Sequence, residues 1–228
     1  MTAHAAAHSF VPATPVPWGV AAGGFASPAE TVELNGPTLN FSRDEEVFGE
    51  GERADSVYRV VSGAVRTFRI LADGRRQICE FHLAGDCFGF EPSAVHRTSA
   101  EALGPTKLVA VRRSALLDNA DTAPEFARLL WRAAVADLQR SQEHVLRLGH
   151  RSAAERVASF LLDVARRLGG HDAFDLPMSR QDIADYLGLT IETVSRSFTQ
   201  LQGLELIAVS SCRHVRLADR EALTGLCE

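Results

Sequence analysis

Four side chains toward the carboxyl end of the chain have the types and the spacing needed to read base pairs in DNA. They are Ile191, Glu192, Ser195 and Arg196, which fall on one side of a helix because they occupy two successive turns. An arginine can donate two hydrogen bonds to guanine, a glutamate can accept one from cytosine, and a serine can bond to base or phosphate. Glu192 and Arg196 also have the four-residue spacing of an ordinary solvent-exposed ion pair, and that pairing is compatible with base contact.

Two short helices joined by a tight turn would present these side chains. Ser179 is a good N-terminal cap with Asp182 three residues later, and Thr190 can cap a second helix. Gly188 permits the backbone turn that a close corner between helices requires. The segment 179–202 therefore predicts a helix-turn-helix, whose second helix places its amino-terminal half in the major groove.

The apolar residues of this segment have the spacing of two helices packed together. Ile183, Ala184 and Leu187 share one face of the first helix, and Val194, Phe198 and Leu201 recur at i, i+4 and i+7 in the second. A small alanine at position 184 would let the two helices cross closely. Ser197 and Gly203 depart from the usual pattern of such motifs, since an apolar residue and a later glycine are expected, so the end of the second helix stays open.

Residues at the helix ends and in the following segment are candidates for binding DNA phosphates. The predicted phosphate contacts are Ser179, Arg180, Thr190, Thr193 and Arg213. Two short β-type runs, LELIAVS and RHVRLAD, follow the second helix and are expected to form a wing. Cys212 lies in the turn between them and is a candidate redox thiol, because its oxidation would disturb phosphate contact.

The overall charge argues against simple electrostatic binding to nucleic acid. The chain has a formal net charge of −5, and residues 151–228 hold nine arginines against eleven acidic residues, a net of −2. Phosphate binding must therefore come from arginines gathered on one face.

Composition excludes several other classes of protein. The hydrophobic share of 46% is typical of a globular chain, and no apolar stretch approaches the length of a membrane span. Four scattered cysteines without a CxxC pair fit neither a disulfide framework nor a zinc site, so we expect no metal. The amino terminus lacks a basic leader, so we expect a cytoplasmic protein without a membrane partner. No nucleophile elbow, phosphate-binding loop or metal-ligand run is present, so we expect no enzymatic activity.

The chain divides into four regions of an α+β protein. Residues 1–30 are rich in Ala, Pro and Gly and are expected to form a mobile arm. Residues 31–118 contain short β-type runs separated by turns, including Ala72-Asp73-Gly74 and Ala84-Gly85-Asp86, as in a barrel or sandwich. A helical region follows at 119–150, and residues 151–228 hold another amphipathic helix and the helix-turn-helix.

The helical region carries a seven-residue repeat that predicts dimerisation. Its two rows are Trp131, Leu138 and Val145, and Ala134, Ser141 and Leu148. Small seam residues with charges on the other faces favour a parallel pair of helices in a homodimer. A single amphipathic helix packed on its own domain is the alternative, since so short a repeat does not exclude it.

Four segments, SVYRVVSGAVR, QICEFHLAGDCFGF, AAERVASFLLDVARR and MSRQDIADYLGLTIETVSR, resemble the Crp/Fnr superfamily of regulators over residues 38–220. Glu192, Ser195 and Arg196 match the E-x-x-S-R motif of its Fnr-like branch. The resemblance implies an N-terminal double-stranded β-roll, a long dimerisation helix and a C-terminal winged helix. It also implies a homodimer that binds a TTGA-N6-TCAA-like DNA palindrome and recruits RNA polymerase.

Two departures from the family indicate the subtype. Cyclic-nucleotide-binding members have a G-E-L and R-S cassette, where this chain has Gly89-Phe90-Glu91-Pro92 and Arg97-Thr98-Ser99. Iron-sulfur members have cysteines in the arm, whereas the first cysteine here is Cys79. The chain is therefore most similar to FixK-type regulators of low-oxygen respiration and nitrogen fixation, which implies no cofactor. A regulator gated by a small molecule bound in the β-roll is the alternative.

Overall fold

The computed structural model describes residues 36–122, 124–149 and 152–227. These residues belong to one unit of the chain. The predicted arm at residues 1–30 lies outside the described residues.

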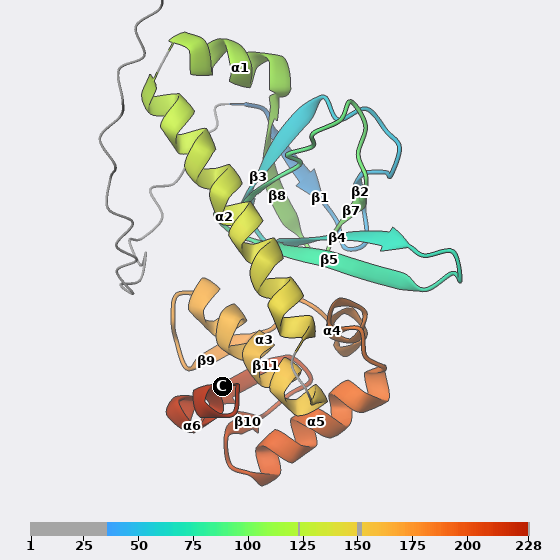
Figure 1. The fold of residues 1–228 in the computed structure, drawn as a ribbon, viewed down its shortest axis with the longest axis vertical. Helices are drawn as coiled ribbons and strands as arrows, with labels where there is room; N and C mark the ends of the chain where they lie inside the picture. The colour runs from blue at the N-terminus through green and yellow to red at the C-terminus, as the bar shows by residue number, and fades with distance from the viewer. Residues whose placement is uncertain (1–35, 123, 150–151, 228) are drawn as a thin grey trace, which may run out of the picture. The chain divides into compact units, whose positions relative to one another are not determined.

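The amino-terminal half of the unit is an antiparallel β-roll of two four-stranded sheets (Figure 1). Its strands are β1 (Thr38–Phe41), β2 (Glu46–Phe48), β3 (Ser56–Ser62), β4 (Ala64–Ile70), β5 (Arg76–Leu83), β6 (Cys87–Phe88), β7 (Ser99–Ala102) and β8 (Thr106–Arg112). One sheet has the order β1-β8-β3-β6 and the other β2-β7-β4-β5. This arrangement confirms the predicted β-roll.

Tight turns connect the strands where the sequence predicted them. Asp73-Gly74 closes the β4–β5 hairpin, and Gly74 has a φ of 81°. Gly63, between β3 and β4, has a φ of 85°, and a Cβ atom there would lie 2.6 Å from the carbonyl oxygen of Pro105. Position 63 therefore requires glycine, because both the backbone conformation and the close approach exclude a side chain.

Aromatic rings fill the interior of the roll. Phe48 stacks on His96 at 3.6 Å between ring centroids, and His82 stacks on Phe88 at 4.6 Å. Tyr58 joins the group at 5.4 Å from Phe88. Such contacts stabilise a core by burying large apolar areas in preferred ring geometries.

Two helices, α1 (Arg113–Thr122) and α2 (Pro124–Leu148), follow the roll. Proline is well suited to the first position of α2 because its missing N–H needs no partner there. The long helix that the sequence predicted is therefore α2, preceded by a separate shorter helix.

The carboxyl-terminal part is a winged helix. Its elements are α3 (Ala153–Arg167), β9 (Ala173–Asp175), α4 (Arg180–Leu187), α5 (Ile191–Gly203), β10 (Ile207–Val209), β11 (His214–Leu217) and α6 (Arg220–Gly225). A three-stranded sheet in the order β10-β11-β9 forms the wing. The sequence predicted β10 and β11 of this sheet but not β9 or α6.

A buried group of ion pairs joins the roll to α2 and α3. The Arg167 guanidinium donates to Asp86 at 2.7 Å and to Glu80 at 3.4 Å. Arg140 of α2 donates to the same Asp86 at 3.3 Å and to Asp137 at 2.9 Å. These carboxylates hold the pKa of Arg167 above its usual value despite its burial. Removing either partner of such a pair would leave an uncompensated buried charge.

The end of α2 packs directly on α4. The His144 ring stacks on Tyr186 at 3.9 Å between centroids, and Arg147 donates to the Tyr186 hydroxyl at 3.1 Å. Burial, followed by the charge of Arg147, lowers the pKa of His144 to about 4. Burial also lowers the pKa of His82 to about 3. Both histidines are therefore neutral in the folded protein at neutral pH.

The lowered pKa values of these two histidines predict that the folded protein is less stable in acid. Below pH 6.5 the unfolded chain takes up protons that the folded chain does not, so the free energy of unfolding should fall as the pH drops toward 4. The slope is at most about 1.4 kcal/mol per pH unit for each histidine. His144→Phe keeps a ring on Tyr186 without a proton site, so urea unfolding should show a shallower pH dependence than in the wild type. Equal slopes for the two proteins would contradict this account.

Candidate nucleic-acid interface

The first helix of the motif, α4, begins with a complete capping box. The Asp182 N–H donates to Ser179 Oγ at 3.1 Å, and the Ser179 N–H donates to Asp182 Oδ2 at 2.9 Å. The helix ends at Gly188, whose φ of 63° lies in the left-handed region. Both ends agree with the sequence prediction, since capping and turn residues act locally.

The second helix, α5, is capped by Thr190, whose Oγ1 accepts from the Thr193 N–H at 3.2 Å. Its inner face is buried as predicted, through Val194, Phe198 and Leu201. Ser197 is also buried, and its hydroxyl donates to the Thr193 carbonyl at 2.9 Å. That hydrogen bond satisfies the hydroxyl, so a polar residue is accommodated where an apolar one was expected.

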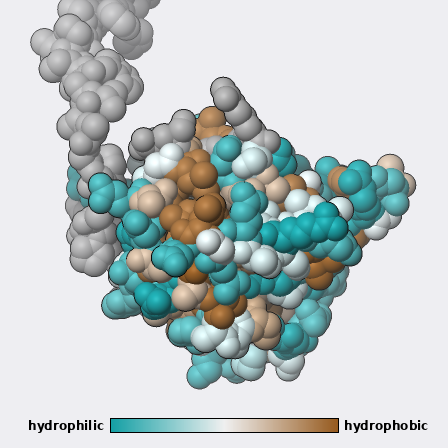
Figure 2. All heavy atoms as spheres, turned by 90° about the horizontal axis from the view of Figure 1, so that it is seen from below, coloured by the Kyte–Doolittle hydropathy of each residue, from teal (hydrophilic) through white to brown (hydrophobic). Residues whose placement is uncertain are grey.

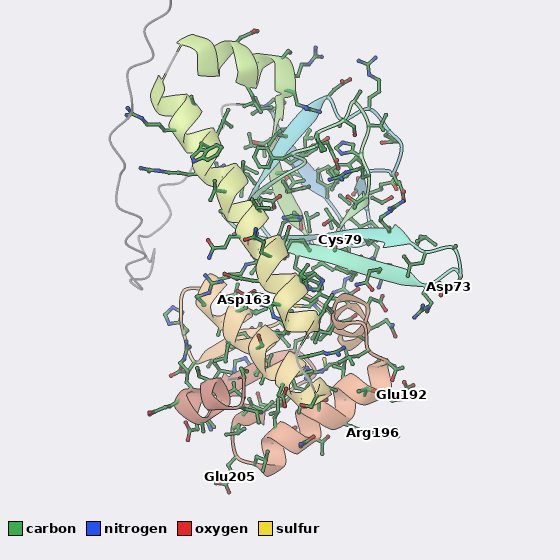
Figure 3. The ribbon with its side chains drawn as sticks, in the orientation of Figure 1. Asp73, Cys79, Asp163, Glu192, Arg196 and Glu205 are labelled. Carbon is green, nitrogen blue, oxygen red and sulfur yellow. The ribbon has the colours of Figure 1, made fainter. Side chains whose placement is uncertain are left out.

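All four predicted base-reading residues are exposed on the amino-terminal half of α5. Figure 3 shows Glu192 and Arg196 on the side of α5 that faces away from α3. Within the described residues, neither side chain forms a hydrogen bond or an ion pair, so the alternative of an ordinary Glu192–Arg196 ion pair is not found there. Ser195 donates to the Ile191 carbonyl at 2.8 Å, which leaves its oxygen free to accept. The arrangement leaves two charged groups of opposite sign available to base edges.

Arg180 has an unusual environment for a predicted phosphate ligand. Its guanidinium carbon lies 3.1 Å from the centroid of the Phe198 ring, and Nη1 is buried without a hydrogen-bond partner. Burial lowers the pKa of Arg180 to about 10, the Cys212 thiol opposes this shift, and no carboxylate contributes to it. An anion beside this group would compensate its lost hydration.

The other predicted phosphate residues lie nearby on the same motif and wing. Thr190 and Thr193 place their hydroxyl oxygens 3.0 Å apart at the start of α5. Arg213, in the wing turn, donates to the Pro177 carbonyl at 3.3 Å. Ser179 and Arg213 line one cleft of about 380 Å³, whose other lining side chains include Arg43 and Asp44. The four residues therefore lie in two places: Thr190 and Thr193 are at the start of α5, and Ser179 and Arg213 line this cleft.

The cysteines follow the pattern that the sequence suggested. Cys79 is half-buried in β5, and Cys87 is buried in β6, where burial raises its pKa to about 11. Cys212 is exposed in the wing turn and is not in a disulfide. A redox role for Cys212 stays a prediction. Within the described residues, no group of three or more His, Cys, Asp or Glu side chains is arranged to hold a metal ion.

The segment compared with the nucleotide cassette of the family differs from it in sequence and has its charged side chains paired with each other. Phe90, which stands where the sequence comparison places the glutamate of the G-E-L cassette, packs against the core cluster that includes Leu116 of α1. The next residue, Glu91, is committed to Arg97, whose backbone N–H and Nε donate to its carboxylate at 3.2 and 3.1 Å. Its carboxylate also lies 3.8 Å from His96. The charges of Glu91 and Arg97 therefore pair with each other.

The predicted dimer seam on α2 is open to solvent in the single chain. Trp131, Leu138 and Val145 are 71%, 57% and 67% exposed. In the second row Ala134 and Leu148 are half-buried, and Ser141 is exposed and donates to the Asp137 carbonyl at 3.1 Å. Figure 2 shows a contiguous apolar area on a surface that is otherwise mostly hydrophilic. A row of large exposed apolar side chains on one helix is typical of an interface.

The α5 helix ends in a Schellman motif with an unfavourable residue. The N–H groups of Leu206 and Glu205 donate to the carbonyls of Leu201 and Gln202, both at 3.0 Å. Glu205 occupies the left-handed position with a φ of 59°, which glycine normally fills. The sequence left the end of this helix open; in the structure Gly203 is the last residue of α5, and the left-handed residue falls two positions later.

Two family models match most of the described chain. The Crp-like helix-turn-helix domain matches residues 155–226, and the cyclic nucleotide-binding domain matches residues 38–122.

Relatives over nearly the whole length support the same assignment. The chain is 51% identical over 213 residues to the nitrogen fixation regulation protein FixK of Azorhizobium caulinodans, covering 91% of this chain and 86% of that protein. It is 43% identical to FixK of Rhizobium meliloti, covering 85% and 90%. The solved structure of FixK2 from Bradyrhizobium japonicum matches with a TM-score of 0.80 and 45% identity, over 86% of this chain and 98% of that one.

A β-roll followed by a winged helix-turn-helix with an exposed reading helix defines a DNA-binding transcription regulator. The chain belongs to the Crp/Fnr family of these regulators, and its similarity to FixK proteins confirms the predicted branch. Its relatives are transcription regulators and not enzymes, in agreement with the sequence prediction. None of the helices within the described ranges is long and apolar enough to cross a bilayer.

The strained end of α5 predicts a stabilising substitution. Glu205→Gly removes the cost of a left-handed non-glycine residue and should raise the free energy of unfolding by about 1 kcal/mol. Gly169 occupies the same position after α3, with a φ of 100°, so Gly169→Ala should lower it by a similar amount. Urea unfolding measures both. A less stable Glu205→Gly protein would show that the glutamate side chain stabilises the turn.

Proposed function

We propose that the chain acts as a homodimeric, cytoplasmic transcription activator that binds a TTGA-N6-TCAA-like palindrome. One observation carries this proposal. Glu192 and Arg196 are exposed on the amino-terminal half of α5, and neither has a protein partner among the described residues. This half of a recognition helix is the part that reaches base edges in the major groove.

The proposed contacts follow from the chemistry of each side chain. Arg196 donates to guanine and Glu192 accepts from cytosine of the G·C pair in each half-site. Ser195 and Ile191 contact neighbouring bases or thymine methyls. The phosphate contacts are Ser179, Arg180, Thr190, Thr193 and Arg213, with Arg180 supported by its lack of an acidic partner.

The division of the chain follows the same scheme. Residues 31–118 form the β-roll, 119–150 the dimerisation region and 151–228 the DNA-binding domain, with 1–30 as an arm. Pairing of two chains along Trp131, Leu138 and Val145 would place two recognition helices about one DNA turn apart. Exposed surfaces of the dimer would then recruit RNA polymerase.

The regulated genes are inferred from the relatives. Two curated proteins with high identity carry the name nitrogen fixation regulation protein FixK. We therefore assign this chain to the control of nitrogen-fixation or low-oxygen respiration genes. A regulator gated by a ligand in the roll is less well supported, because Glu91 and Arg97 are paired with each other.

The base-reading role of Arg196 is testable by substitution. Arg196→Ala should cost about 1–3 kcal/mol of binding free energy on the palindrome and reduce discrimination against a G·C-swapped site. Arg213→Ala, at a proposed phosphate contact in the wing turn, should weaken binding to both DNAs equally, because a phosphate contact carries no sequence information. Fluorescence anisotropy at fixed salt measures the affinities of the wild type and both variants for the two DNAs. Equal wild-type affinity for both DNAs would refute base reading.

The α2 seam predicts the oligomeric state. Leu138→Arg places a charge at the centre of the apolar row, so the chain should sediment as a monomer and lose affinity for the palindrome. Gln139→Lys adds the same charge one residue away, off the seam, and should remain dimeric. Sedimentation equilibrium measures the oligomeric state of each variant. A Leu138→Arg protein that stays dimeric would exclude this face as the interface.

A further inference from the structure

The carboxylate of Asp182 takes part both in the cap of α4 and in a contact with the β-roll. It is only 4% exposed, and its Oδ2 accepts from the Ser179 N–H and hydroxyl in the capping box of α4. Its Oδ1 accepts from Arg66 Nη1 at 3.0 Å and from Arg76 Nη2 at 2.8 Å. The two arginines come from β4 and β5, so the first turn of the helix-turn-helix is bonded directly to the β-roll.

Arg76 extends this connection along α4. Its Nε donates to Asp185 Oδ2 at 2.8 Å, so one guanidinium bridges two carboxylates that lie three residues apart on the helix. Gln77, the next residue of β5, donates to the Tyr186 carbonyl at 3.4 Å. A planar guanidinium bound to two carboxylates fixes orientation as well as distance, since its donors point in set directions.

Carboxylates of the β-roll hold Arg66 in place. Its Nε donates to Glu101 of β7 at 3.1 Å, and its Nη2 donates to Asp44 at 2.9 Å. The side chain is buried, and all its terminal nitrogens have carboxylate partners. It therefore anchors Asp182 to a fixed point in the sheet, whereas Arg76 contacts acidic groups of α4 alone.

An orientation imposed on α4 passes to the reading helix. The two helices are joined by a short turn at Gly188, and Ile183, Ala184 and Leu187 share a core with Val194, Phe198 and Leu201. Because this interface is closely packed, α4 and α5 move together. Whatever fixes α4 against the roll also fixes where Glu192 and Arg196 lie in each half of a dimer.

We propose that Arg76 and Asp185, together with the Arg66–Asp182 contact, are positioning residues that set the DNA half-site spacing the dimer accepts. The inference rests on the proposed palindrome binding by a homodimer. The bridge holds the two reading helices at one separation and one rotation, so it selects the six-base-pair spacer against neighbouring lengths. Adding or removing one base pair rotates a half-site by about a tenth of a DNA turn, which a rigid pair of readers does not follow.

The test compares Arg76→Met with Arg69→Met in the full-length chain. Arg69 is on the same hairpin but bonds Glu50 of the roll, at 3.1 and 2.6 Å, and not α4. Both substitutions remove one positive charge and keep a long apolar side chain, so general electrostatic effects on DNA affinity are matched. Asp185→Asn provides a second variant that breaks the bridge from the helix side without altering the hairpin.

Affinities are measured for palindromes with five, six and seven spacer base pairs and for a six-spacer DNA with the G·C pairs swapped. The wild type and Arg69→Met should prefer six base pairs by about tenfold or more, and Arg76→Met and Asp185→Asn by less than about threefold. Discrimination against the swapped site should persist in all four proteins, because the reading side chains are untouched. A merely destabilised domain would lose affinity on every DNA without changing the spacing ratio.

The outcomes separate the inference from the function on which it rests. Spacing ratios in Arg76→Met and Asp185→Asn equal to those of the wild type would overturn the positioning role, with palindrome binding intact. Loss of G·C discrimination in these variants would also overturn it, because the reader itself would be damaged. A wild type indifferent to both spacing and swap would refute the proposed palindrome binding itself.

Discussion

Two buried guanidinium groups of this chain bond carboxylates that lie on other elements than the arginines. Arg167 of α3 reaches Asp86 and Glu80 of the roll, while Arg66 of β4 reaches Asp182 of α4. None of these charges can be buried alone, because the cost of desolvating an isolated ion exceeds what packing returns. The roll, the long helix and the winged helix are thus held together by polar contacts with defined directions, as well as by the apolar core.

The same pairing explains how a domain of net charge −2 binds DNA. Several acidic residues of the domain are occupied by arginines: Asp163 by Arg166, Asp172 by Arg220, and Asp182 and Asp185 by Arg76. Their negative charge is largely compensated away from α5. Arg180, by contrast, is half-buried against Phe198, and no carboxylate contributes to its pKa. A whole-domain sum therefore says little about the potential near the reading helix.

Local features were predictable from the sequence, and distant ones were not. The caps at Ser179 and Thr190 and the turn at Gly188 depend on neighbouring residues, so their patterns can be read directly. The Arg66–Asp182 contact joins residues 116 positions apart, and no periodicity announces it. Asp182 was identified correctly as a capping residue, but the hydrogen bonds of its second carboxylate oxygen to Arg66 and Arg76 of the roll were not predicted. Short elements such as β9 and α6 were missed because their formation depends on the sheet and core that receive them.

Asp182 also limits how freely the two halves of such a protein can be exchanged. One carboxylate completes a helix cap with one oxygen and receives two arginines of the roll with the other. A chimera that joined this roll to a foreign winged helix with glutamine at that position would keep the capping box, yet remove the carboxylate that Arg66 and Arg76 share. The Asp182 side chain therefore belongs to both modules. Recombination at the backbone linker alone would separate Asp182 from Arg66 and Arg76, the two arginines that it binds.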